Sequence, residues 1–84
     1  MTLSWDHNAW EEYLYWQETD KKVLRKINDL IKESLRTPFA GTGKPEPLKG
    51  NLRGFWSRRI TDEHRLVYEI KDNGIHILQC RFHY

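Results

Sequence analysis

The fold is decided by residues 55–84, which read FWSRRITDEHRLVYEIKDNGIHILQCRFHY. Aromatic and β-branched residues alternate with polar ones along FWSRRI (55–60), HRLVYEI (64–70) and IHILQCRFHY (75–84). A period of two predicts strands with one buried face. Asp72-Asn73-Gly74 separates the last two segments and is typical of a hairpin turn, while Asn51–Gly54 or Thr61–Glu63 can supply the other turns. We therefore expect consecutive antiparallel strands.

The segments before this sheet have a helical period instead. The first expected helix buries a face formed by Trp10, Tyr13, Leu14 and Gln17. The second, over residues 21–36, buries a face formed by Leu24, Ile27, Ile31 and Leu35. Asp6 and Asp20 are N-cap candidates, and Pro38 ends the second helix. The two helices are expected to form a hairpin.

The stretch TPFAGTGKPEP (37–47) contains all three prolines and two glycines, which predicts a loop. Met1–Trp5 is expected to be a short first strand, and Leu48–Asn51 can add another. The order is thus β-α-α-β-β-β. It predicts an α+β fold in which two N-terminal helices pack on one face of a mainly antiparallel four- to five-stranded sheet. With 84 residues we expect a single domain, residues 1–84.

Composition narrows the class of protein. A single cysteine excludes an internal disulfide, and the apolar runs are too short for a signal peptide or a membrane span. We therefore expect a soluble cytoplasmic protein. Residues 44–84 carry eight Lys/Arg against five Asp/Glu, whereas residues 1–43 carry six against seven. A basic C-terminal half fits a polyanionic partner, although an excess of this size is also common on ordinary surfaces.

Strand alternation sorts the C-terminal side chains into two faces. The face toward the helices is expected to hold Leu66, Tyr68, Ile70, Leu78, Cys80 and Phe82. The other face is expected to display Arg59, Arg65, Arg81 and His83 close together. Like charges on adjacent strands repel, so this face is either a solvated surface partly paired with Glu63 and Glu69 or a site for an anion.

These residue types fit RNA cleavage by attack of the 2′-OH group. Glu46, held between Pro45 and Pro47 and flanked by Lys44 and Lys49, is the candidate base. His83 is the candidate acid, because an imidazole changes protonation near neutral pH. Arg65, with Arg59 or Arg58 beside it, can bind phosphate oxygens. Tyr84 offers a ring for an unstacked base and a phenol for a phosphate, although terminal residues are often frayed.

Metal and cofactor sites are not indicated. The histidines at 64, 76 and 83 have no metal-ligand spacing, and no Cys-x-x-Cys pair or acidic cluster is present. Gly41-Thr42-Gly43-Lys44 lacks the spacing of a phosphate-binding loop. Cys80 is expected to be a small buried hydrophobe and not a nucleophile.

The stretch KPEPLKGNLRGFWSRRITDEHRLVY (44–68), the ending CRFHY (80–84) and WEEYLYWQETDKK (10–22) closely resemble the YoeB family of bacterial toxins, within the RelE/ParE superfamily. The resemblance implies a ribosome-dependent endoribonuclease that cuts mRNA in the 30S decoding site without metal and so stops translation. It implies Glu46 as general base, His83 as general acid, Arg65 as the stabiliser of the phosphorane, and Tyr84 as part of the catalytic set. RNA contacts are expected from Lys44, Lys49, Arg58, Arg59 and Arg81.

The same resemblance implies partners. A YefM-type antitoxin neutralises such toxins with an extended C-terminal segment, homodimers can form, and DNA is contacted only indirectly through the antitoxin complex. This chain has Gly50 where relatives often have His, so no role is expected at that position. Two alternatives stay open: a non-catalytic RNA- or protein-binding module, and a relative that acts on DNA gyrase.

Overall fold

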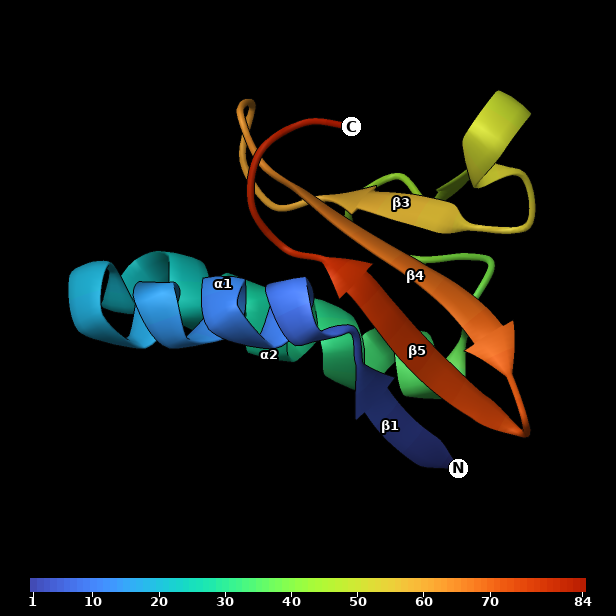
Figure 1. The fold of residues 1–84 in the computed structure, drawn as a ribbon, viewed down its shortest axis with the longest axis horizontal. Coiled ribbons are helices and arrows are strands. Elements are labelled where there is room, and N and C mark those ends of the chain that lie inside the picture. Colours follow the sequence, from blue (N-terminus) through green and yellow to red (C-terminus); the bar gives the residue numbers. More distant parts are fainter.

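The computed structural model describes residues 1–84 and places two helices against one face of a five-stranded sheet (Figure 1). The elements are β1 (Thr2–Trp5), α1 (His7–Thr19), α2 (Lys21–Arg36), β2 (Glu46–Pro47), β3 (Trp56–Arg59), β4 (Arg65–Lys71) and β5 (Gly74–Gln79). The strand order is β1-β5-β4-β3-β2, and only the β1–β5 pair is parallel. The expected α+β class and element order are confirmed.

The predicted capping residues hold the two helices. The Asp6 carboxylate accepts a hydrogen bond from the Asn8 N–H at 3.3 Å. The Asp20 carboxylate accepts from the N–H groups of Lys22 and Val23, and the Asp20 N–H donates to the Trp16 carbonyl. Asp20 therefore ends α1 and begins α2, which turns the chain back on itself without a loop.

The buried face of α1 agrees only in part with the prediction, since Tyr13 packs against the core as expected but Trp10 does not. Ala9 and Trp16 are buried, whereas Trp10 is 43% exposed and packs its ring on Trp5 and Tyr13 at the surface. The small Ala9 side chain lets the helix approach the sheet so closely that its carbonyl accepts a weak hydrogen bond from the Cys80 thiol. The inward side of α1 therefore combines a small residue, Ala9, with a large one, Trp16.

The face of α2 agrees with the prediction. Ile27, Leu30 and Ile31 are buried, and Leu24 and Leu35 pack at the edge of the same core. These side chains meet Leu66, Tyr68, Ile75 and Ile77 from the sheet. The main core cluster thus lies between the sheet and the two helices, which cover one sheet face in Figure 1.

All three predicted turns are present, including the one at 51–54, where the Arg53 N–H donates to the Gly50 carbonyl. The carbonyl of His64 accepts the N–H groups of Ile60 and Thr61, which closes the turn at 61–63. In the β4–β5 hairpin, Asp72 and Asn73 have φ values of 51° and 59°, the left-handed conformation that two-residue hairpins require. The register of β3, β4 and β5 follows from the last two of these turns.

The last strand is shorter than predicted. β5 ends at Gln79, and a bulge pairs Val67 with Gln79 but Tyr68 with Ile77. The extra residue, Leu78, shifts the alternation by one. Ile75, Ile77 and Cys80 therefore face the core, Leu78 is only half-buried, and Phe82 is 55% exposed. Ile70, also expected in the core, is 38% exposed near the outer end of its strand.

The segment before β3 also differs in detail. Leu48–Asn51 is not a strand, and Gly50–Leu52 forms one turn of 3₁₀ helix. Instead Glu46–Pro47 adds a two-residue edge strand, in which Glu46 pairs with Ser57. The loop prediction for 37–47 otherwise holds up to this strand.

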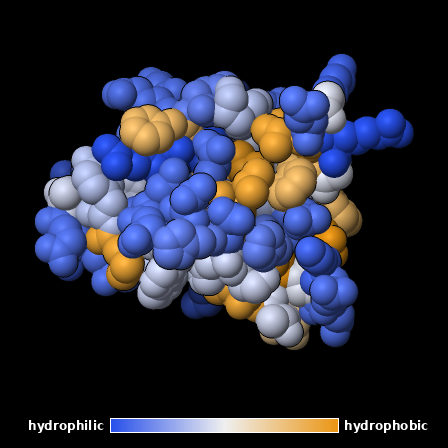
Figure 2. Space-filling model, viewed as in Figure 1, coloured by the Kyte–Doolittle hydropathy of each residue, from blue (hydrophilic) through white to orange (hydrophobic).

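The surface is mostly polar. Figure 2 shows hydrophilic side chains over most of the face seen in Figure 1, with apolar side chains appearing between them in separate patches. Neither helix combines the length and the apolar character that a membrane span needs.

Candidate active site

A cavity of about 170 Å³ lies on the sheet face opposite the helices, and its walls come from three distant parts of the chain. Six residues predicted for the site line it: Lys44, Glu46, Arg59, Arg65, His83 and Tyr84. Gly43 and Ser57 complete the lining. All four residues predicted to be catalytic therefore share one hollow.

Tyr84 joins the C-terminus to the edge strand. Its hydroxyl donates a hydrogen bond to Glu46 Oε1 at 3.2 Å and lies 3.3 Å from Ser57 Oγ. Because the single phenolic proton goes to Glu46, the Ser57 hydroxyl is the donor to the phenol oxygen. Ser57 is 2% exposed, so its position is fixed by the sheet. The three residues form a chain that orients the Glu46 carboxylate.

One edge of the Arg65 guanidinium is occupied by the turn that precedes it. Nη1 donates to the carbonyls of Thr61 at 2.6 Å, His64 at 3.1 Å and Asp62 at 3.2 Å. Nε and Nη2 have no partner in the protein, and the side chain lines the cavity. The turn thus fixes the group and leaves its other edge available to a bound anion.

Arg59 is the direct cross-strand partner of Arg65. The Arg59 side chain is 49% exposed, and its Nη1 lies 3.9 Å from Oδ1 of Asp62. With Lys44 the cavity holds three cationic side chains against the Glu46 carboxylate. This excess is electrostatically unfavourable without an anion, since like charges opposite one another cost up to about 1 kcal/mol.

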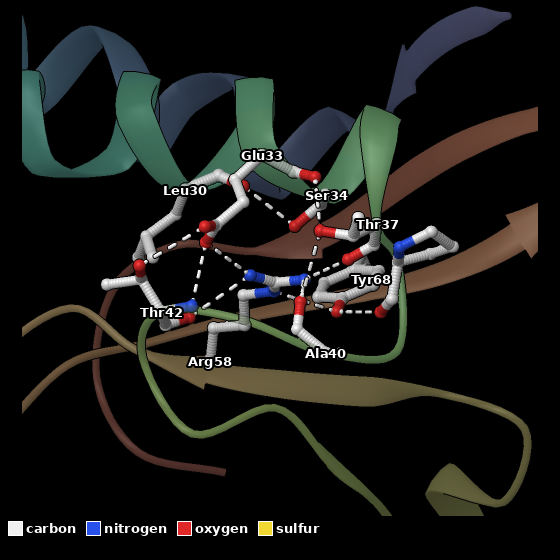
Figure 3. A network of polar contacts seen from close by, with 9 residues as sticks. Leu30, Glu33, Ser34, Thr37, Ala40, Thr42, Arg58 and Tyr68 are labelled. Atoms are coloured by element: carbon white, nitrogen blue, oxygen red, sulfur yellow. Dashed lines mark hydrogen bonds and ion pairs between the residues drawn. The ribbon is translucent and has the colours of Figure 1, made fainter.

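Arg58 does not belong to this site, and its predicted contact with RNA is wrong. The side chain is 0% exposed and lies on the helix side of the sheet, as Figure 3 shows. Its Nε donates to the Tyr68 hydroxyl, Nη1 to Glu33 and the Thr42 carbonyl, and Nη2 to the carbonyls of Thr37 and Ala40. An arginine has five N–H donors, so none remains for a phosphate.

The Arg58 contacts hold the irregular loop that leads to Glu46. Glu33 supports the same loop, because its carboxylate accepts the Thr42 N–H at 2.8 Å and the Thr42 hydroxyl at 3.2 Å (Figure 3). The Thr42 N–H, then the Thr42 hydroxyl and the Arg58 charge, lower the pKa of Glu33 below 4.5 despite partial burial. In the same loop, the Gly43 carbonyl accepts a hydrogen bond from the Arg59 N–H at 2.7 Å.

A glycine is required at position 43, where the loop passes close to β3. Its φ is 85°, and a Cβ there would lie 3.1 Å from both Arg58 Cβ and Leu30 Cδ2. The loop can therefore pass this close to β3 only with glycine at this position. The prediction missed Gly43 and Ser57 because neither carries a catalytic group. Ser57 lies two residues before Arg59 on the same strand, so strand alternation places both on the same sheet face, and this was the available signal.

Arg81 and Lys49 lie outside the cavity. The Arg81 guanidinium stacks on the Tyr15 ring of α1 at 3.6 Å and on the Phe82 ring at 4.5 Å. The expected position of Arg81 beside Arg59 and Arg65 is wrong, because the strand ends before residue 81. Lys49 is exposed, and its side chain does not line the hollow.

Cys80 is buried, as expected, and burial beside Glu12 raises the pKa of its thiol to about 12. A thiol that stays protonated is a poor nucleophile. The Cys80 N–H donates to Glu12 Oε1 at 2.8 Å, and its carbonyl accepts from Trp16 Nε1 at 2.9 Å. Cys80 therefore attaches the C-terminal segment to α1. No group of three or more His, Cys, Asp or Glu side chains has the arrangement of a metal site.

Comparison with known proteins adds to this geometry. A family model described as YoeB-like toxin of bacterial type II toxin-antitoxin system matches residues 5–84. Toxin YoeB of Escherichia coli K12 is 63% identical, with both chains covered completely. A solved YoeB/ParE toxin from Agrobacterium tumefaciens is 56% identical, with a TM-score of 0.97 and full coverage of both chains.

Two solved structures from Staphylococcus aureus are also similar, each with a TM-score of 0.92 and coverage of 100% of this chain and 98% of the other. One is a YoeB–YefM complex at 47% identity, and the other is a YoeB dimer at 48% identity. The similarity therefore extends over the whole length of these toxins.

We predict that Arg58→Met lowers the free energy of unfolding by about 3 kcal/mol or more, because it leaves three loop carbonyls and the Tyr68 hydroxyl without their donor. Urea denaturation measures this change. The neighbouring Arg59→Met removes the same charge from a half-exposed site and should change stability by no more than about 1 kcal/mol, the cost of its repulsion with Arg65. Equal stability of the two variants would show that the buried network does not hold the loop.

The lowered pKa of Glu33 predicts a pH dependence of stability. Its contribution is fully present above 4.5, the ordinary value, and is lost as the pH falls through the lower folded-state pKa. Glu33→Gln should therefore unfold more easily at pH 7 and lose less stability than wild type between pH 5 and 3. Denaturation at a series of pH values tests this, with the exposed Glu18→Gln as control. A Glu33→Gln slope equal to that of wild type would contradict it.

Proposed function

The chain belongs to the YoeB-like toxins of bacterial type II toxin–antitoxin systems, and on this basis we propose that it is a metal-independent endoribonuclease that cuts mRNA on the ribosome. One observation carries the proposal: Glu46, Arg65, His83 and Tyr84 line the same cavity although 38 residues separate Glu46 from Tyr84. Such a toxin would act in the cytoplasm, where ribosomes and mRNA meet.

The proposed reaction is an internal transfer within RNA. Glu46 takes the proton of the 2′-OH, whose oxygen attacks the adjacent phosphorus and forms a 2′,3′-cyclic phosphate. The bond from phosphorus to the 5′-oxygen breaks, and His83 gives a proton to that leaving oxygen. Tyr84 occupies Glu46 Oε1, which leaves Oε2 free to accept the proton. The reaction needs no other reactant.

The cationic residues supply the electrostatic part of catalysis. The free edge of Arg65 can donate to the phosphate oxygens, which gain negative charge in the transition state. Because three carbonyls already hold Arg65, little reorganisation is needed when RNA binds. Arg59 and Lys44 add positive charge at the same opening and are proposed to contact RNA phosphates. Lys49 is proposed to contact RNA outside the cavity.

The cavity size limits what enters it. At about 170 Å³ it is smaller than the roughly 300–1,000 Å³ of sites for whole drug-sized ligands. It has room for the phosphate and neighbouring sugar atoms, while bases stay outside. The Tyr84 ring, 43% exposed, is available for stacking on such a base. This arrangement suits RNA that another particle holds in place, as the decoding site holds mRNA.

Partners are proposed from the solved relatives. The complex from Staphylococcus aureus contains YefM, and we propose that a YefM-type antitoxin neutralises this chain and provides any contact with DNA. The dimer from the same organism supports homodimer formation here.

Glu46→Ala, Arg65→Ala and His83→Ala are each expected to lower mRNA cleavage by about 10²-fold or more, as loss of an acid, a base or a charge stabiliser does. Cleavage is measured by mapping 5′ ends of mRNA after brief induction and with purified ribosomes. Arg53→Ala, which removes one exposed charge outside the cavity, is the control and should cleave normally. Circular dichroism checks that each variant folds.

Two results would contradict the proposal. If all three variants still block protein synthesis, the assignment of the site is wrong. If wild type binds RNA in a salt-sensitive way and yields no cut products with ribosomes present, the chain is a binding module and not an enzyme.

Removing only His83 and Tyr84 tests the role of the C-terminus. The hydrogen bonds of Cys80 and Phe82 remain in this variant, so it should fold and bind antitoxin as wild type does. Cleavage should fall below detection, because the acid and the partner of Glu46 are both absent. Retained cleavage, measured on the same ribosome-bound mRNA, would show that the terminal pair is not part of the catalytic site.

A further inference from the structure

The C-terminal segment after β5 reaches the cavity through a small number of contacts. Cys80 is attached to α1, and the Gln79 side chain donates to the carbonyls of Arg81 and Phe82 at 3.1 and 3.2 Å. Figure 1 shows this segment curving away from β5 toward β3. Phe82 is the last residue whose backbone hydrogen-bonds to another part of the fold, because the Tyr84 carbonyl contacts only the ring of the adjacent His83, so the paths of His83 and Tyr84 are set at Phe82.

Phe82 is held in an unusual backbone conformation by two consecutive residues of β4 and its turn. Its φ is 67°, in the left-handed region, which costs a residue with a Cβ roughly 1–2 kcal/mol. The Phe82 N–H donates to His64 Nδ1 at 2.8 Å, and the Phe82 carbonyl accepts from the Arg65 N–H at 3.0 Å. A left-handed residue reverses the chain direction, so these two bonds decide where the next side chains point.

The His64 residue is itself held in place by contacts to Trp16 and Thr61. It packs edge-on against Trp16, with ring centroids 4.8 Å apart, and the Thr61 hydroxyl caps its backbone N–H at 3.1 Å. Because Nδ1 accepts a hydrogen bond, the neutral ring carries its proton on Nε2. His64 does not line the cavity and lies next to Arg65, which does.

We propose that His64 is a positioning residue for cleavage: its Nδ1 holds the Phe82 N–H and thereby directs His83 and Tyr84 into the cavity. The activity part of this inference rests on the proposed function, whereas the placement of the C-terminus does not. A role in packing alone would need only the bulk of the ring against Trp16 and Phe82. The acceptor atom is what separates the two roles.

Two substitutions isolate that atom. In His64→Asn the side-chain oxygen takes the place of Nδ1 and can still accept the Phe82 N–H, although much of the ring is lost. In His64→Leu most of the bulk remains and the acceptor is lost. We expect His64→Leu to lower kcat by about 10- to 100-fold, with KM within about 3-fold, because misplacement of a catalytic group by about 1 Å has effects of this size. His64→Asn should keep kcat within about 3-fold of wild type.

A second readout does not depend on activity. Carboxypeptidase releases C-terminal aromatic residues faster when the chain end is mobile, so Tyr84 should be released sooner from His64→Leu than from wild type or His64→Asn. Circular dichroism and binding to the antitoxin serve as folding controls. If His64→Leu fails to fold, His64→Phe keeps an aromatic ring against Trp16, removes the acceptor atom, and should give the same loss of kcat and faster release of Tyr84.

The outcomes are distinct. Normal kcat in folded His64→Leu or His64→Phe, or a His64→Asn variant as impaired as His64→Leu, would overturn the proposal. If wild type does not cleave mRNA on ribosomes, the proposed function fails. The comparison of Tyr84 release rates between wild type and the His64 variants still decides whether His64 holds the C-terminus.

Discussion

Arg58 lies buried between α2 and the sheet, where all five of its N–H groups donate hydrogen bonds and most of them go to the loop before β2. That loop has little regular structure of its own. A single guanidinium supplies the donors that a strand or helix would otherwise give its carbonyls. Lys44 and Glu46 follow directly, so the position of the candidate base depends on a buried cation 12 residues further along the chain.

The C-terminal segment is held in a comparable way. After the bulge in β5 this segment leaves the sheet. Isolated hydrogen bonds then fix its path: Glu12 and His64 accept from it, and Trp16 and Arg65 donate to it. The cavity therefore lies between two irregular segments, both attached to a rigid sheet and core. Its three cations, two of them directly opposite across β3 and β4, repel one another in the free protein. An anionic ligand would relieve that repulsion, which is consistent with the RNA binding that we propose.

Much of the fold could be predicted from local pattern. The period of two along β3 and β4, the left-handed turn at Asp72-Asn73 and the Asp20 cap are local signals, and each is present in the structure. Glu46, Arg65, His83 and Tyr84 were selected by chemistry together with family resemblance, and they meet in one cavity. The prediction that extended a local period past the end of β5 failed. Arg81 was placed on the open face because the alternation was extended past Gln79, where the bulge and the end of β5 had already broken it.

The sequence by itself therefore determined the element order, the turns, the fold class and the residue types of the candidate site. These depend on interactions between residues close in the chain, which periodicity and capping report directly. Only the tertiary structure decided that Arg58 is buried with all five of its donors used within the protein. It also decided that Ala9, and not Trp10, faces the core, and that Tyr84 meets Glu46. The physical reason is that burial and hydrogen-bond partners are set by segments far apart in sequence, and no local pattern records which of those segments come together.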